Sequence, residues 1–85
     1  MYKNKAKDGR NNISGRKIME YRMKLPGSVS QNGLASMLQV EGLDLDKNAI
    51  QRIECGKRFV TDIELKVFAK VLNVTYGDLL DDETA

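Results

Sequence analysis

Apolar residues recur at helical spacing along most of this chain. Ile18, Tyr21 and Leu25 lie on one face of a helix that is expected to begin near residue 13 and to end at Pro26-Gly27. A second run at the same spacing consists of Leu65, Phe68, Ala69 and Leu72. No segment alternates with period two for long enough to indicate a strand. The pattern therefore predicts an all-α chain.

One local motif occurs four times and predicts where four further helices begin. An apolar residue precedes a capping residue, and another apolar residue follows four positions after the cap. The four sets are Val29-Ser30 with Leu34, Leu45-Asp46 with Ile50, Val60-Thr61 with Leu65, and Val74-Thr75 with Leu79. In this hydrophobic staple, the cap accepts an unpaired N–H and the apolar pair fixes the direction of the incoming chain. Glu64 completes a capping box with Thr61, and Gly56 suits the residue that ends the third helix. A compact five-helix domain is expected.

The length of 85 residues indicates one domain, which we divide into three parts. Residues 1–12 are polar and basic without periodicity, so a flexible arm is expected there. That arm is either a solvated terminus or an additional electrostatic contact with a polyanion. Residues 13–80 form the helical domain, and residues 81–85 form an acidic tail.

Composition argues against several classes of function. The chain has no histidine and one cysteine, Cys55, so neither a metal centre nor acid–base catalysis is expected, and we predict no cofactor. No apolar run reaches the roughly 18 residues of a membrane span, and no secretory signal is recognisable. A lone thiol without a disulfide partner is typical of a reducing compartment, most simply the cytoplasm.

Charge is distributed unevenly along the chain. Residues 1–60 carry twelve Lys or Arg against six Asp or Glu, whereas residues 61–85 carry two against six. The net charge of +6 on the first part and −4 on the second indicates a surface that faces an anion such as a nucleic acid. Chance unevenness in a short chain is the alternative.

Helices two and three carry a resemblance to a known family. Ser30-Gln31 opens the second helix, Leu34-Ala35 packs it, and the stretch from Ile50 through Glu54 and Gly56 to Arg58 closes the third. This pattern resembles the Cro and phage-repressor type of helix-turn-helix domain, the xenobiotic-response-element family, over about residues 14–80. The resemblance implies a lambda-repressor-like fold with the helix-turn-helix on helices two and three. The turn at residues 39–44 is longer than is usual in the family.

The resemblance implies that the third helix, about residues 46–55, lies in the major groove of DNA and that its first turns reach the bases. Asn pairs with adenine, Arg or Lys donates to guanine, and a small residue allows contact with a thymine methyl. The base-contact residues implied in this way are Lys47, Asn48, Ala49, Gln51 and Arg52. The alternative for each is a solvated polar position on an exposed face.

The resemblance also implies phosphate contacts and one structural ion pair. Gln31 at the start of helix two, and Lys57 and Arg58 after helix three, are expected to contact the DNA backbone. The alternative for Lys57 and Arg58 is charge complementation at a helix C-terminus. Arg22 and Glu54 are expected to form a partly buried ion pair that fixes the third helix.

These features together predict sequence-specific binding of double-stranded DNA by a small bacterial or phage-type transcriptional regulator, a repressor rather than an enzyme. A homodimer on DNA is expected, with helix five and the acidic tail as the dimerisation region, and no ligand-binding domain is expected. An antitoxin that represses its own operon is one alternative. A protein-interaction module that has lost DNA binding is another, and Glu41 and Asp44 before helix three are its best support.

Overall fold

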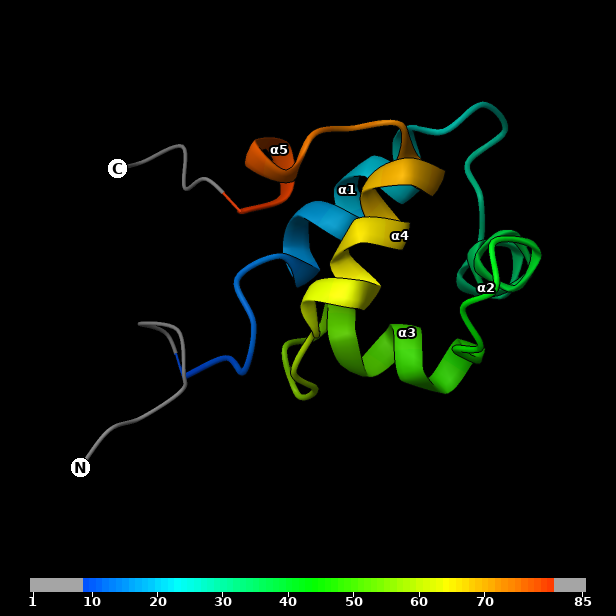
Figure 1. Ribbon diagram of the computed structural model, residues 1–85. Coiled ribbons are helices and arrows are strands. Elements are labelled where there is room, and N and C mark those ends of the chain that lie inside the picture. Colours follow the sequence, from blue (N-terminus) through cyan, green and yellow to red (C-terminus); the bar gives the residue numbers. More distant parts are fainter. Residues whose placement is uncertain (1–8, 81–85) are drawn as a thin grey trace.

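The computed structural model describes residues 9–80, and these residues form five helices (Figure 1). They are α1 (Gly15–Lys24), α2 (Gln31–Val40), α3 (Lys47–Glu54), α4 (Asp62–Leu72) and α5 (Tyr76–Leu80). No strand occurs among residues 9–80, so the predicted all-α class and the number of helices are confirmed. The acidic tail and residues 1–8 of the predicted arm lie outside the described residues.

Each predicted cap makes the hydrogen bond that its staple implies. Ser30 accepts from the Gly33 N–H and begins α2, and Asp46 accepts from the Ala49 N–H and begins α3. Before α4, the Thr61 hydroxyl accepts from the Glu64 N–H while the Glu64 carboxylate accepts from the Thr61 N–H. Thr75 and Asp78 exchange the same pair of bonds before α5. The four predicted helix starts are therefore confirmed.

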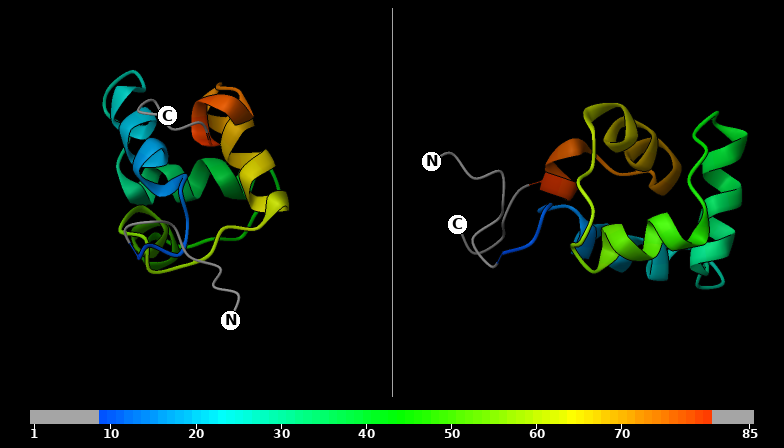
Figure 2. Two further views of the ribbon diagram at one scale, coloured as in Figure 1. Left: turned by 90° about the vertical axis from the view of Figure 1, so that its left-hand side faces the viewer. Right: turned by 90° about the horizontal axis from the view of Figure 1, so that it is seen from below.

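The core consists of the apolar faces of all five helices. Phe68 of α4 is fully buried, together with Ile18 of α1 and Leu79 of α5. α3 contacts α1 and α2, while α4 contacts α1, α2 and α5. In Figure 1, α3 runs along the lower edge of the domain, and the view from below in Figure 2 shows it across the front. One long side of α3 therefore faces away from the rest of the molecule.

The long turn between α2 and α3 is anchored at several points. Gly42, at a φ of +89°, ends α2, and its N–H donates to the Gln39 carbonyl. The next N–H, of Leu43, donates to the Leu38 carbonyl, which completes the hydrogen-bond pattern of a Schellman motif. Leu43 and Leu45 both pack against the core. The additional residues therefore fix where α3 begins.

Residues 10–12 differ from the expectation of a flexible arm over residues 1–12. They lie against the end of α3, where their side chains and one backbone N–H donate to carbonyl groups. The last carbonyls of a helix lack partners within the helix, so a polar segment passing close by can satisfy them. We call residues 10–12 the strap. The folded domain begins before the predicted boundary at residue 13.

Candidate nucleic-acid interface

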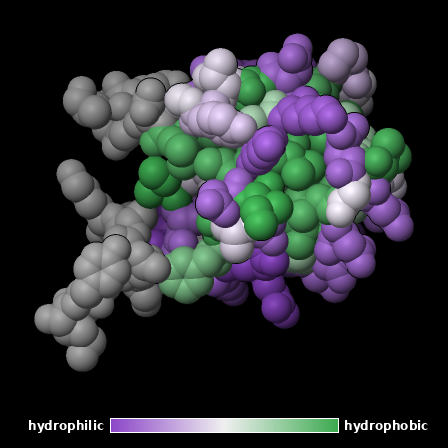
Figure 3. All heavy atoms as spheres, viewed as in Figure 1, coloured by the Kyte–Doolittle hydropathy of each residue, from purple (hydrophilic) through white to green (hydrophobic). Residues whose placement is uncertain are grey.

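The outward face of α3 is polar and exposed along its whole length. Ile50, Ile53 and Glu54 are buried and seat the helix on α1 and α2. The opposite face exposes Lys47, Asn48, Gln51 and Arg52. Hydrophilic side chains gather along the lower edge of the space-filling view, at the level of α3 (Figure 3). Four of the five residues predicted to contact bases thus share one accessible surface.

Ala49, the fifth predicted base-contact residue, is partly buried. Its N–H donates to the Asp46 carboxylate at 2.8 Å, which satisfies one of the unpaired amides of the first turn. The charge of Asp46 also suits the positive end of the helix dipole. Ala49 therefore helps to hold the start of α3 in place as much as it contributes to the outward face.

The Glu54 carboxylate is the centre of a hydrogen-bond network at the end of α3. Arg22 Nε lies 2.7 Å from Glu54 Oε2, and Arg22 Nη2 lies 3.1 Å from Oε1. The Gln31 amide nitrogen donates to the same Oε1 at 2.9 Å. Arg22 also donates to the Val29 carbonyl at 2.7 Å. The expected pair of Arg22 and Glu54 is thus present, and it joins α1, α2 and α3.

Burial makes this network sensitive to substitution. The Glu54 side chain is 4% exposed and the Arg22 side chain 12% exposed. A buried carboxylate is tolerated only when its oxygens are paired, and here three donor groups reach them. The side-chain amide of Gln31, predicted to contact phosphate, is therefore used inside the protein, while its position at the start of α2 is unchanged.

Arg58, the second predicted phosphate contact, has a partner inside the domain. Its Nη1 and Nη2 donate to the two carboxylate oxygens of Glu64, each at 2.9 Å. Its side chain is 33% exposed and that of Glu64 is 11% exposed. Sequence analysis found Glu64 as part of a capping box but missed this pairing, which joins the loop after α3 to α4.

The pairing shifts the pKa of both groups. Burial acts to raise the pKa of Glu64, but the hydrogen bonds from Arg58 and Thr61 outweigh it and leave that pKa below its usual value. The hydrogen bond to Glu64 raises the pKa of Arg58, and burial opposes this shift only in part. Both groups are charged at neutral pH.

Lys57, the third predicted phosphate contact, is exposed at the end of α3. It follows Gly56, whose φ of +84° is the left-handed conformation that the sequence predicts at this helix end. The Lys57 N–H donates to the Arg52 carbonyl at 2.8 Å, and its own carbonyl accepts from the Asn11 side chain. The backbone of Lys57 is thus held while its side chain faces solvent.

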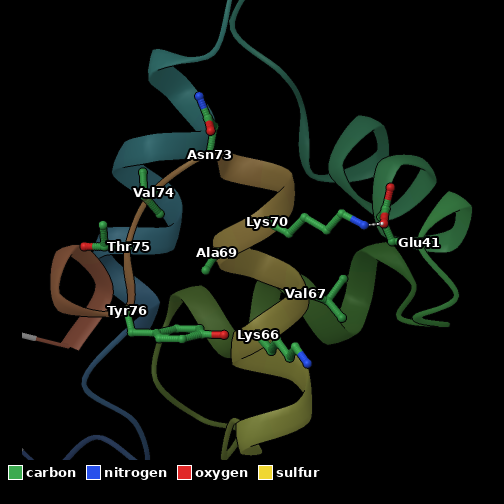
Figure 4. Close-up of a pocket in the computed structure, with 9 residues that line it drawn as sticks. All are labelled: Glu41, Lys66, Val67, Ala69, Lys70, Asn73, Val74, Thr75 and Tyr76. Carbon is green, nitrogen blue, oxygen red and sulfur yellow. Dashed lines mark ion pairs between the residues drawn. The ribbon is translucent and has the colours of Figure 1, made fainter.

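A second feature lies along α4, between the end of α2 and the start of α5. An open groove of about 680 Å³ is lined by Glu41, Lys66, Val67, Ala69, Lys70, Asn73, Val74, Thr75 and Tyr76 (Figure 4). Lys70 Nζ lies 2.6 Å from Glu41 Oε1. Glu41, for which the sequence offered no structural role, therefore joins the end of α2 to α4.

Among residues 9–80, no group of His, Cys, Asp and Glu side chains could hold a metal ion. No helix within that range is long and apolar enough to cross a membrane. Cys55 is exposed as a free thiol, with its Sγ 3.7 Å from the Arg52 carbonyl oxygen.

In the comparisons with known proteins, no family model, no curated protein and no solved structure matches this chain.

Proposed function

We propose that α2 and α3 form the helix-turn-helix of a lambda-repressor-like domain, and that the chain binds double-stranded DNA sequence-specifically as a small transcriptional regulator of the repressor type. The observation that carries the proposal is the amphipathic character of α3. Its inner face is seated by Ile50, Ile53 and Glu54, and its outer face is uninterrupted and polar. A helix held in this way is suited to the major groove, where side chains are read against base edges.

The outward residues have the chemistry that the role requires. Asn48 matches the donor and acceptor pair of adenine, and Arg52 and Lys47 match the two acceptors of guanine. Lys57 supplies a positive charge beyond the end of α3, suited to a phosphate group. Because Gln31 and Arg58 are bonded within the protein, Lys57 ranks first among the phosphate contacts.

Binding as a homodimer completes the proposal. One copy offers a single reading helix, and two-fold pairing places two such helices on half-sites about 34 Å apart. Tyr76 and Leu80 of α5 are exposed apolar side chains suited to a contact between copies. Sedimentation of the complex with a palindromic duplex should then give two chains per duplex.

The deciding experiment is selection of binding sites from random duplexes, with measurement of the salt dependence of affinity. A specific duplex whose binding weakens steeply with salt supports the proposal. Retention of no duplex at low salt, by protein with intact helical structure, would contradict it. That second outcome would favour the protein-interaction module, although the pairing of Glu41 with Lys70 has removed part of the support for it. An autorepressing antitoxin would bind DNA in the same way and would in addition capture a toxin protein.

Replacement of Arg52 by alanine sharpens the test. Loss of a bidentate contact should cost about 1–3 kcal/mol of specific binding and relax the preference at one base. Lys66→Ala is the matched control, because it removes an exposed cation from α4 rather than from α3. Uniform weakening of Arg52→Ala on all sequences would instead make Arg52 a phosphate contact.

A further inference from the structure

The strap satisfies carbonyl groups at the end of α3 with groups from a distant part of the chain. Arg10 Nη2 donates to the Glu54 carbonyl at 2.7 Å. The Asn11 N–H donates to the Gly56 carbonyl at 2.8 Å, and Asn11 Nδ2 donates to the Lys57 carbonyl at 2.9 Å. Three carbonyls that a helix end would otherwise leave to water are therefore paired with one short segment.

Asn12 joins three parts of the fold through one side chain. Its Nδ2 donates to the Ile53 carbonyl at 3.0 Å and to the Arg58 carbonyl at 2.7 Å. Its Oδ1 accepts from the Gly15 N–H at 2.8 Å, at the beginning of α1. Both donor hydrogens of the amide and one lone pair of its oxygen are used, so the end of α3, the loop after it and the start of α1 are held in one arrangement.

The two glycines beside the strap lie in close contact with it. A Cβ atom on Gly15 would collide with the Ile53 carbonyl oxygen, so the start of α1 lies directly against the end of α3. A Cβ atom on Gly56 would lie 2.8 Å from side-chain atoms of Arg10. The Arg10 side chain therefore covers Gly56, the residue at which the chain turns away from α3.

We propose that the strap is a positioning device for Lys57, a role that rests on the proposed function. By holding the carbonyls of Lys57 and Arg58, residues 10–12 fix the loop at the end of α3 and therefore the point from which the Lys57 side chain reaches a phosphate group. The strap makes no contact with DNA in this role. It acts through the loop.

Two uncharged substitutions test the role of the strap. Asn12→Ala removes the bonds to the Ile53 and Arg58 carbonyls and also the acceptor of the Gly15 N–H. Asn11→Ala breaks one hydrogen bond, the one to the Lys57 carbonyl. The same substitution takes away Asn11 Oδ1, a buried atom without a hydrogen-bond partner among residues 9–80. Asn11→Ala should therefore fold about as well as the wild type and keeps the test decisive if Asn12→Ala is unstable. Gln39→Ala, an exposed amide of α2, is the control.

Hydrogen exchange measures, without DNA, how firmly the strap holds the loop after α3. The N–H groups of Lys57 and Arg58 both donate to the Arg52 carbonyl. In Asn12→Ala these two amides should exchange at least about tenfold faster, because the loop opens locally, while amides of α4 keep their rates. Unchanged exchange at both amides would overturn the proposal, whatever the protein does with DNA.

A double-mutant cycle on a duplex selected with the wild type measures the consequence for binding. Lys57→Ala should lower the salt slope by about 1, as the loss of one phosphate contact does. If the strap positions Lys57, Asn12→Ala or Asn11→Ala lowers the slope in the same way, and combination with Lys57→Ala weakens binding no further. Additive losses would overturn the positioning role. Absence of duplex binding by the wild type would contradict the proposed function, and the exchange result would then decide the strap by itself.

Discussion

At its first turn, α3 is held by a local cap, in which the Ala49 N–H donates to Asp46. At its last turn, α3 is held by groups from α1, α2 and the strap, which reach Ile53, Glu54 and Gly56 across long stretches of sequence. The first turn carries the exposed Lys47 and Asn48, whereas Glu54 is buried. The last turn of α3 is thus held by long-range contacts, whereas its first turn is held locally and exposes its polar side chains. This difference fits the proposed role, in which the first turns of a recognition helix reach the bases.

Removal of the Glu54 carboxylate should cause the largest loss of stability, because it breaks the long-range contacts at the last turn of α3. Glu54→Ala leaves Arg22 and Gln31 without their acceptor, and breaking a buried ion pair from one side costs about 3–5 kcal/mol. The free energy of unfolding in urea measures this loss. Glu41→Ala, which breaks an exposed pair with Lys70, is the control and should cost about 0–1 kcal/mol. Equal losses in the two variants would show that Glu54 does not anchor α3.

Removal of the Asp46 cap should cause a smaller loss of stability, because it breaks only a local hydrogen bond at the first turn of α3. Asp46→Ala leaves the Ala49 N–H unpaired, and the loss of a cap of this kind costs about 1 kcal/mol. Urea unfolding measures the cost, and the matched control is Asp44→Ala, an exposed aspartate two residues earlier. If Asp46→Ala costs no more than the control, the cap contributes nothing to the start of α3.

The pair of Arg58 and Glu64 should give the smallest effect, expressed as a dependence on pH. The pKa of Glu64 is lowered in the folded protein, whereas an unfolded chain titrates glutamate near pH 4.3. Its contribution is therefore complete above that pH and is lost as the pH falls through the lower folded-state pKa.

Comparison with Glu64→Gln across the acid range isolates this contribution. The free-energy difference from the wild type should be below about 1 kcal/mol at neutral pH, since Arg58 is partly exposed, and should shrink in acid. Glu20→Gln, an exposed glutamate of α1, serves as the control. A difference that grows as the pH falls would contradict the direction of the shift.

The parts of the fold that the sequence predicted correctly are the ones with local causes. Ser30, Asp46, Thr61 and Thr75 each bond to an N–H three residues later, so the signal and the structure occupy the same few positions. The outward face of α3 follows likewise from the spacing of Ile50 and Ile53. The pairing of Arg22 with Glu54, 32 residues apart, was available only through the resemblance to a family.

The interactions that the sequence could not indicate span long separations without periodicity. Asn12 bonds to carbonyls 41 and 46 residues further along the chain, and backbone carbonyls carry no mark in a sequence. Glu41 meets Lys70 only because α2 packs on α4. Composition therefore assigned residues 10–12 to a flexible arm, although three-dimensional packing makes them part of the domain.

The amphipathic character of α3 has a consequence for protein engineering. The side chains of Lys47, Asn48, Gln51 and Arg52 project from a helix whose placement depends on other residues. A library randomised at these four positions would keep the core, the network around Glu54 and the strap unchanged. Most of its members should therefore fold, so that a selection from it compares binding preferences rather than differences in folding. The chain is in this sense a small scaffold with one replaceable surface.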